Sequence, residues 1–530
     1  MSGLHYATGR SRSPILGILG ATAIALGGAG AVQAQDVSVP DAASRCAALA
    51  QRRVPADAFA LPTSGATPLE AKIVAANGAE GEYCRLRGSI DAANASDPAI
   101  MFQVNLPSRW NLKTVQFGGG GSNGVLIEAT GAFSNGGGST PSALSRGFVT
   151  YGSDSGHQGR GSEFLDNPQA FANYSHEAVK RTKDLVTALV RTYYGRDARR
   201  NYHIGGSKGG QEALQAAQRY YADFDGVVSY YPAAQNQSLT IGWNRLWHFA
   251  FGTPGGALNT AEQTLLKQSV MKTCDGLDGA TDGIVSNMAA CETAFDARRL
   301  RCPDGGNNGD QCLSDVQIAT LREAGKRFKF AYPMPNDVTS VGPWPVLTGG
   351  DLQLWLGNGV DGSQQAFYRA TAARPEALKS TGLSRAAWAK VAYRAKVYDA
   401  SNPDLDAFRA KGGKLLLVQG TTDMLVPLSM TTDYYKRISA RYGAGLKSFA
   451  RYYVAPGFGH GGGIFHMQWD SLSALDAWVE GGLAPAQPVA TDGAAETRGR
   501  TRPLCEYPSW PKYRGSGSLD LADSFLCARR

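Results

Sequence analysis

The chain has 530 residues, of which 43% are hydrophobic and 18% charged, so a wholly disordered protein is excluded and more than one small core is expected. Its formal net charge of +8 is small for this length, and the densest basic run, at 298–301, has no interleaved aromatic residues. We therefore expect no nucleic-acid partner.

The first 34 residues have the features of an export signal. Arg10 and Arg12 give it a positive start, and residues 15–31 form a modest apolar stretch. Val32 and Ala34 then place small residues before a cleavage site. The apolar stretch is rich in glycine and is a poor membrane span, which needs about 20 strongly apolar residues. We therefore predict a cleaved signal peptide at 1–34 and a periplasmic or secreted protein, with a permanent anchor helix as the less favoured alternative.

The next part of the chain alternates between strand and helix patterns. Three short runs rich in β-branched and aromatic residues, at 100–106, 113–117 and 147–152, predict strands. Residues 176–194 carry apolar side chains on one helical face, which predicts a helix. This alternation is typical of a mostly parallel sheet covered by helices on both faces.

A second alternating run appears late in the chain. Its predicted elements are a strand at 414–419, a helix at 431–442, a strand at 449–454 and a helix at 472–479. Between these two runs the alternation fades into Gly-, Asn-, Asp- and Trp-rich sequence. We therefore predict one α/β domain formed by 35–232 and 402–530, with 233–401 inserted as a lid domain. No segment after residue 34 is long and apolar enough to predict a membrane span.

A glycine-rich turn joins a predicted strand to a predicted helix at Ser207. Residues 202–204 run into the sequence GGSKGG at 205–210, and residues 211–221 have a helical pattern. This is G-x-S-x-G in its diagnostic context, where flanking side chains would crowd the strand and the helix. A serine hydroxyl is a weak nucleophile until a base takes its proton. An ordinary glycine-rich loop is the alternative interpretation.

Candidates for the acid and the base follow two later strands. Asp423 follows the strand at 414–419 through a Gly-Thr-Thr turn, and His460 follows the strand at 449–454. The chain order serine, aspartate, histidine is that of α/β-hydrolases. We therefore predict an α/β-hydrolase fold with Ser207, Asp423 and His460 as the catalytic triad. A capping role for the aspartate and a structural role for the histidine are the alternatives.

The remaining histidines are weaker candidates for the base. His466, at the start of a predicted helix, is the only serious rival to His460. The others lie in predicted regular elements, in an early loop or in the inserted segment: His176, His203, His157 and His248.

Several segments resemble the tannase and feruloyl esterase family. They are the glycine loop at 118–124, GGSKGG at 205–210, CDGLDGATDG at 274–283, QGTTDMLVP at 419–427, PGFGHGGG at 456–463 and PLCEYPSWPKYRGSG at 503–517. Together they span nearly the whole chain after the signal. The resemblance implies a serine esterase that hydrolyses feruloyl, galloyl or terephthaloyl esters through an acyl-enzyme.

The same resemblance implies an oxyanion hole and a metal site. The main-chain N–H groups of Gly121 and Lys208 would stabilise the charge that develops on the substrate oxygen. A structural calcium ion in the lid would bind oxygen atoms only, as this hard cation prefers. Its implied ligands are the carboxylates of Asp275, Asp278 and Asp282 and the main-chain oxygens of Ala280 and Ile284. An Asp-Gly turn cluster is the alternative, and no organic cofactor is implied.

All eight cysteines lie after the predicted signal peptide. An even number behind an export signal indicates disulfides, and none has the CxxC spacing of a zinc or redox site. Eight cysteines allow many pairings, of which neighbour pairing is the simplest. The family resemblance implies the same four bridges: Cys46–Cys84, Cys274–Cys291, Cys302–Cys312 and Cys505–Cys527. Buried free thiols are the alternative.

The chain departs from the family pattern beside the triad. The family usually has a disulfide between the residue before the serine and the residue after the histidine, and here these residues are Gly206 and Gly461. This departure puts the rigidity of the triad in question. Lys208 stands where a smaller or acidic residue is common, and we expect it to alter the charge at the pocket mouth.

The predicted lid carries candidate substrate contacts. We expect Trp355, Phe367 and Tyr368 to pack on an aromatic ring and Arg369 to face a substrate carboxylate, unless these aromatic residues fill the core of the lid. Two other classes of function stay open, an exported binding protein without turnover and a serine peptidase. The expected partner is a small aromatic ester, and the sequence leaves its acid, its alcohol and the oligomeric state open.

Overall fold

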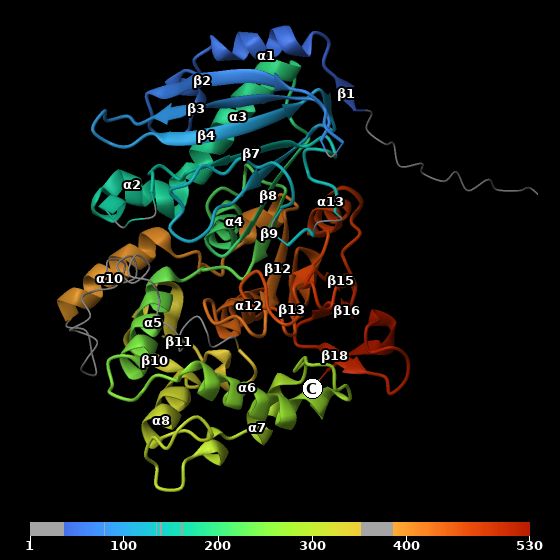
Figure 1. The fold of residues 1–530 in the computed structure, drawn as a ribbon. Coiled ribbons are helices and arrows are strands. Elements are labelled where there is room, and N and C mark those ends of the chain that lie inside the picture. Colours follow the sequence, from blue (N-terminus) through green and yellow to red (C-terminus); the bar gives the residue numbers. More distant parts are fainter. Residues whose placement is uncertain are drawn as a thin grey trace, which may run out of the picture. The chain divides into compact units, whose positions relative to one another are not determined.

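The centre of the protein is a ten-stranded mixed β-sheet, seen in a computed structural model that describes residues 36–529 apart from 79, 134, 138–139, 160, 162 and 351–384. The strands are β2 (Gly65–Val74), β3 (Tyr83–Asp91), β4 (Ile100–Pro107), β6 (Lys113–Phe117), β7 (Val149–Ser153), β8 (Arg200–Gly206), β9 (Gly226–Tyr230), β12 (Lys414–Gly420), β13 (Ala450–Ala455) and β17 (Cys505–Glu506). Their order across the sheet is β17-β13-β12-β9-β8-β6-β7-β4-β3-β2 (Figure 1).

The middle of the sheet is parallel and both of its edges are antiparallel. The strands β13, β12, β9, β8, β6 and β7 pair in parallel. Strands β4, β3 and β2 extend one edge antiparallel, and β17 does so at the other. The α/β fold predicted from the alternating sequence is therefore confirmed, with a mixed sheet in which the parallel strands are central.

Helices bury both faces of the parallel strands. The helices of the two chain segments that form the sheet are α1 (Ala42–Ala50), α2 (Pro168–Ala172), α3 (Ala178–Tyr194), α4 (Lys208–Gln218), α11 (Asp406–Ala410), α12 (Leu428–Tyr442) and α13 (Ser471–Gly481), of which α1 packs on β2 and β3. In β12, Leu416 and Val418 pack with α13, whereas Leu415 and Leu417 pack with α4 and α12. Each fully buried aliphatic side chain contributes about 1.5–3 kcal/mol relative to exposure, so this uninterrupted apolar strand is stable only between two helical layers.

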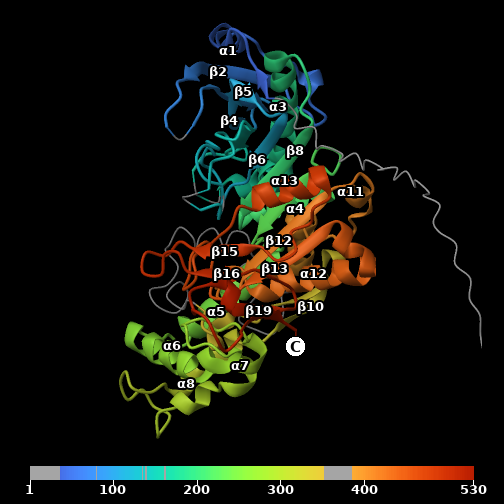
Figure 2. The ribbon, with the colours of Figure 1, turned by 90° about the vertical axis from the view of Figure 1, so that its right-hand side faces the viewer.

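The segment between β9 and β12 forms elements outside this sheet. They are α5 (Asn236–Ala250), α6 (Thr260–Cys274), α7 (Met288–Ala294), α8 (Asp315–Ala324), α10 (Arg385–Tyr398) and an antiparallel pair of strands, β10 (Phe328–Met334) and β11 (Val338–Val341). Helices α6, α7 and α8 lie together in both views (Figures 1 and 2). Their apolar core also includes Met424 and Val426, which flank the turn after β12. This segment is therefore packed against the loop that carries the predicted catalytic acid.

Smaller sheets complete the described part of the chain. They pair β1 (Val37–Ser38) with β5 (Arg109–Trp110), β14 (Met467–Gln468) with β15 (Val489–Asp492) and β16 (Thr501–Pro503), and β18 (Trp510–Tyr513) with β19 (Phe525–Ala528). None of the helices in the described ranges is long and apolar enough to cross a membrane.

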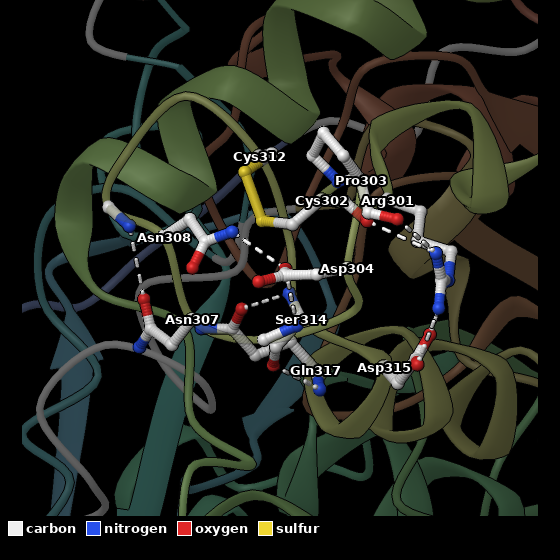
Figure 3. The surroundings of a disulfide bond; sticks show 12 residues. Arg301, Cys302, Pro303, Asp304, Asn307, Asn308, Cys312, Ser314, Asp315 and Gln317 are labelled. Carbon is white, nitrogen blue, oxygen red and sulfur yellow. Dashed lines mark hydrogen bonds and ion pairs between the residues drawn. A yellow bond between two sulfur atoms is a disulfide. The ribbon is translucent and has the colours of Figure 1, made fainter.

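Four disulfide bonds link all eight cysteines. The predicted pairing is confirmed in full: Cys46–Cys84, Cys274–Cys291, Cys302–Cys312 and Cys505–Cys527. Figure 3 shows the loop closed by the third of these bridges, where Asp304 accepts hydrogen bonds from the N–H of Gly306 at 2.9 Å and from the side chain of Asn308 at 2.6 Å. Free thiols are thereby excluded as the explanation of the even cysteine count.

Candidate active site

Ser207 lies on a strained turn between β8 and α4. Its backbone has φ 58° and ψ −117°, in a region that residues other than glycine rarely adopt. The turn is held by hydrogen bonds to the end of β9 and the chain just after it: the Ser207 N–H donates to the Tyr230 carbonyl at 3.0 Å, and the Ser207 carbonyl accepts from the N–H of Ala233 at 3.0 Å. Such strain is typical of a serine nucleophile on a sharp strand-to-helix turn.

The glycines around Ser207 are required by close backbone contacts. A Cβ atom on Gly205 would lie 2.5 Å from the carbonyl carbon of Gly209, and a Cβ atom on Gly209 would lie 2.7 Å from the carbonyl oxygen of Gly119. The Gly209 N–H donates to that same oxygen at 2.9 Å. The early glycine loop is therefore packed directly on the turn that carries Ser207.

Asp423 and His460 meet on loops that follow two neighbouring parallel strands. The strands β8, β12 and β13 all point the same way, so their carboxyl ends reach one edge of the sheet, where open α/β sheets place their binding sites. The distance between His460 Nδ1 and Asp423 Oδ2 is 2.9 Å. The structure therefore brings the predicted acid and base together at the edge where β8 delivers Ser207.

The Asp423 carboxylate is fully buried and held by several donors. Its Oδ1 accepts the N–H groups of Leu425 and Val426, each at 2.9 Å, and its Oδ2 accepts the side chain of Gln419 at 3.2 Å in addition to His460. The Ser207 hydroxyl makes no hydrogen bond to any described residue. Catalytic hydrogen bonds of this kind often tighten only when substrate binds.

The rival histidine has a different setting from the one predicted. His466 does not begin a helix: it directly precedes β14, and α13 begins only at Ser471. Its backbone N–H donates to Asp492 at 2.9 Å. The helix predicted at 472–479 starts within one residue of α13, so only the placement of His466 at its start was wrong.

Comparison with known proteins identifies the family. The family model for tannase and feruloyl esterase matches residues 84–348 and 353–528. The chain belongs to this family. Among its relatives, an uncharacterised esterase of Agrobacterium fabrum is 35% identical over 522 residues, covering 92% of this chain and 94% of that protein. Mono(2-hydroxyethyl) terephthalate hydrolase of Piscinibacter sakaiensis is 32% identical, covering 84% of this chain and 85% of that protein.

A solved structure of the family has the same fold. The crystal structure of feruloyl esterase B from Aspergillus oryzae superposes with a TM-score of 0.77 at 20% identity, covering 92% of this chain and 99% of that chain. As a member of the tannase and feruloyl esterase family, the chain is a carboxylic ester hydrolase with an α/β-hydrolase fold.

In this tannase and feruloyl esterase family member, a buried carboxylate holds the glycine loop. Glu212 of α4 accepts the N–H of Gly119 at 3.1 Å, the side-chain amide of Asn123 at 2.8 Å and the ammonium of Lys208 at 3.0 Å. Sequence reasoning missed Glu212. Its position one helical turn after Lys208, at a spacing that favours an ion pair, is the signal that could have found it.

The Lys208 side chain points into the protein and not to the pocket mouth, contrary to the expectation from sequence. Its ammonium donates to Gln211 at 2.6 Å and lies 4.8 Å and 5.3 Å from the ring centres of Tyr174 and Tyr398. Burial lowers the pKa of this ammonium, and the carboxylate of Glu212 opposes that effect. The positive charge is therefore neutralised inside the fold.

The predicted oxyanion donors lie on the two elements that this network joins. Gly121 has φ 59°, and its carbonyl accepts the Tyr174 hydroxyl at 3.2 Å. Within the described ranges, the N–H groups of Gly121 and Lys208 have no hydrogen-bond acceptor. They are thus free to donate to a substrate oxygen.

The predicted calcium ligands form a turn that is closed by backbone hydrogen bonds. Asp275 accepts the N–H of Gly283 at 3.0 Å, and Asp278 accepts that of Ala280 at 3.0 Å. Asp282 accepts the N–H of Ile284 at 3.0 Å. Ala280 and Ile284 are themselves buried.

The ligand atoms offered by this turn are oxygens, which suit a calcium ion, but the three carboxylates do not converge on one point. The carboxylates of Asp275 and Asp278 are buried and form no ion pair with any described residue, and burial raises the pKa of Asp278 to about 6. The carboxylate of Asp282 instead pairs with Arg502. In the described part of the chain, no three acidic, histidine or cysteine side chains converge as metal ligands.

The candidate substrate contacts of the lid, Trp355, Phe367, Tyr368 and Arg369, lie outside the described residues, as does the predicted signal peptide at 1–34.

Proposed function

We propose that the chain is an exported serine esterase that hydrolyses esters of aromatic acids through an acyl-enzyme on Ser207. The observation that carries this proposal is the His460–Asp423 hydrogen bond of 2.9 Å at the sheet edge where the strained Ser207 turn lies. An acid, a base and a serine on such loops form the machinery of acyl transfer.

The proposed reaction begins with attack of the Ser207 hydroxyl oxygen on the ester carbonyl. His460 takes the hydroxyl proton on Nε2, because the hydrogen bond to Asp423 keeps the imidazole proton on Nδ1 and leaves Nε2 free to accept. The N–H groups of Gly121 and Lys208 donate to the carbonyl oxygen as it becomes negative. His460 then gives its proton to the departing alcohol, which leaves an acyl-enzyme.

Water completes the cycle by the same route. His460 accepts a proton from the water molecule as it attacks the acyl carbonyl, and Ser207 leaves with that proton as the free acid is released. Asp423 stays ionised throughout and stabilises the imidazolium that forms twice in each cycle.

The names of the relatives support an aromatic acid as the acyl group. They include a mono(2-hydroxyethyl) terephthalate hydrolase and a feruloyl esterase C. Hydrolysis of methyl ferulate, methyl gallate and mono(2-hydroxyethyl) terephthalate, measured side by side, distinguishes the three acyl classes.

Export, a lid and a calcium ion belong to the same proposal. Residues 1–34 would direct export, and four disulfides suit the oxidising compartment beyond the membrane. Residues 233–401 would cover the substrate, and Asp275, Asp278 and Asp282 would bind calcium as a structural ion that takes no part in ester cleavage.

Replacement of Ser207 by alanine tests the proposed nucleophile. We expect turnover to fall by about 10⁶-fold, as loss of a triad serine does, while the melting temperature stays near that of the parent. The parent should react with an active-site phosphonate and show a burst with an activated aromatic ester, and Ser207→Ala should do neither. A variant that keeps more than a few per cent of activity refutes the assignment, and a parent without turnover favours a binding protein.

A further inference from the structure

A single tyrosine side chain contacts the surroundings of both Ser207 and His460. Tyr231 directly follows β9, and its ring centre lies 4.6 Å from that of the His460 imidazole, with 51° between the planes. Its hydroxyl donates to the side-chain oxygen of Asn135 at 3.0 Å. The side chain is 8% exposed, so it forms a packed wall of the site.

The Tyr231 hydroxyl lies against two glycines that flank the proposed catalytic residues. A Cβ atom on Gly206, just before Ser207, would lie 2.7 Å from this oxygen. A Cβ atom on Gly461, just after His460, would lie 3.4 Å from it. The first contact is too short for any real Cβ atom, so a glycine at 206 is what leaves room for the tyrosine.

The backbone fixes Tyr231 between the two loops. Its φ of 31° is a strained value for a bulky residue and costs on the order of 1–3 kcal/mol. This backbone conformation is kept in place by a hydrogen bond from the Tyr231 N–H to the carbonyl of Val418 in β12, at 2.7 Å. The preceding carbonyl, that of Tyr230, accepts the N–H of Ser207. The tyrosine is thus anchored to the strand that leads to Asp423 and to the turn that carries Ser207.

His460 needs a second constraint that Asp423 does not supply. One hydrogen bond at Nδ1 fixes one point of the ring and leaves its plane free to turn about that bond. The histidine also lies between Gly459 and Gly461, which give its loop more backbone freedom than other residues would. Packing of a rigid aromatic ring against the imidazole removes the rotation that the hydrogen bond permits.

We propose that Tyr231 is a positioning residue for ester hydrolysis: its ring sets the plane of the His460 imidazole, and its hydroxyl, bound to Asn135, holds that ring in place between the Ser207 turn and the His460 loop. This inference rests on the proposed triad. Because the base must meet the serine in one geometry, and displacement of reacting groups by about 1 Å can cost about 10²-fold in rate, the effect belongs to turnover and not to substrate binding.

Two substitutions separate the ring from the hydroxyl. Tyr231→Leu removes both contacts, and we expect kcat to fall by about 10²-fold with KM nearly unchanged. Tyr231→Phe keeps the ring against His460, so most of the lost kcat should return. Tyr194→Phe is the matched control, because Tyr194 is also 8% exposed and its hydroxyl donates one bond, to the carbonyl of Pro107 at 2.9 Å. It should turn over like the parent.

The acceptor of the hydroxyl provides an independent test. Asn135 has φ 58°, so Asn135→Gly removes the acceptor without straining the backbone. This variant and Tyr231→Phe should lower kcat by similar small factors. The double variant should be no worse than either single variant, because both substitutions remove the same Tyr231–Asn135 hydrogen bond. Melting temperatures identify any variant that fails to fold, and the two mild variants keep the proposal testable if Tyr231→Leu does so.

The outcomes distinguish this inference from the proposed triad. If Tyr231→Leu is folded and keeps the kcat of the parent, or if its loss appears only in KM, the positioning role is refuted while Ser207→Ala can still be inactive. If Ser207→Ala is active, the proposed function is refuted, and the positioning role that rests on it is refuted as well. A kcat loss restored by phenylalanine and absent from Tyr194→Phe supports the role.

Discussion

Two histidines near the Ser207 turn have opposite surroundings. His203 lies within β8, is fully buried, and neither of its ring nitrogens has a hydrogen-bond partner in the described part of the chain. Burial lowers its pKa to about 4. His460 lies on a loop at the end of β13, is partly exposed, and is bonded to the buried carboxylate of Asp423.

The difference shows what makes a histidine useful as a base. Nearness to the serine along the chain favours His203. A buried ring whose nitrogens have no hydrogen-bond partner and no access to substrate, however, stays neutral and packs, here with its centre 5.9 Å from that of the Phe224 ring. A carboxylate behind the imidazole stabilises its protonated form, and a position at the strand ends exposes its other nitrogen. The groups around a histidine therefore decide whether it can act as a base.

The largest effect should separate His460 from its remaining rival. His460→Ala should lose about 10⁶-fold in kcat, because loss of the base is as damaging as loss of the nucleophile. His466→Ala should keep most of its activity, since the hydrogen bonds found for His466 are made by its backbone N–H and carbonyl, which alanine retains. Steady-state kinetics on one aromatic ester measures kcat for both variants. The reverse pattern would identify His466 as the base.

A smaller effect should appear in the pH dependence of unfolding. Between about 4 and 6.5, the unfolded chain protonates His203 and the folded chain does not. The unfolded state therefore binds more protons, and the free energy of unfolding decreases as pH falls through this window, by as much as about 3 kcal/mol from this group.

Substitution of His203 isolates that contribution. His203→Leu should lose less stability than the parent between pH 6.5 and 4, as measured by denaturant unfolding at each pH. His466→Leu serves as the control, because His466 is only partly buried. Parallel pH curves for His203→Leu and the parent would contradict the neutral, buried state of His203.

The smallest effect concerns the two buried carboxylates of the proposed calcium turn, those of Asp275 and Asp278. A cation bound only by the folded protein adds RT ln(1 + [L]/Kd), about 2.7 kcal/mol at a hundredfold excess over Kd. Excess chelator should therefore lower the melting temperature and added Ca²⁺ should restore it. Asp278→Asn should abolish this response while Ser207 still reacts with a phosphonate.

A nearby aspartate gives the control for the calcium response. Asp304 is exposed in the loop of Figure 3 and lies outside the proposed ligand set, so Asp304→Asn should respond to calcium like the parent. A melting temperature that ignores chelator, with no calcium found by elemental analysis, would favour the simple Asp-Gly turn.

Sequence patterns predicted the centre of the fold better than its edges. Strand β6 matches its predicted range, β12 differs from its range by one residue at one end, and β13 differs by one residue at each end. These strands could be found because continuous apolar runs bounded by turns indicate strands buried on both faces. The two residues of β17 were not predicted as a strand, since they become one only by pairing with β13. A pattern within one segment carries no information about such a distant partner.

The candidate site shows the same limit. The motifs around Ser207, Asp423 and His460 have fixed chain order and local turns, so they could be found from the sequence. The inward direction of the Lys208 side chain depends on Tyr174 and Tyr398, which come from other parts of the chain. The contact of Tyr231 with His460 likewise exists only once β9 and the loop after β13 are in place.

The strand order has a consequence for when the enzyme becomes active. Strands β8 and β9 are close in sequence and can pair early, whereas β12 reaches its place beside β9 only after the long segment between them has been enclosed. Asp423 and His460 arrive with β12 and β13, on the C-terminal side of that closure. A partly folded chain would therefore carry the proposed nucleophile without its proposed base, and ester cleavage would begin only after β12 and β13 have joined the sheet.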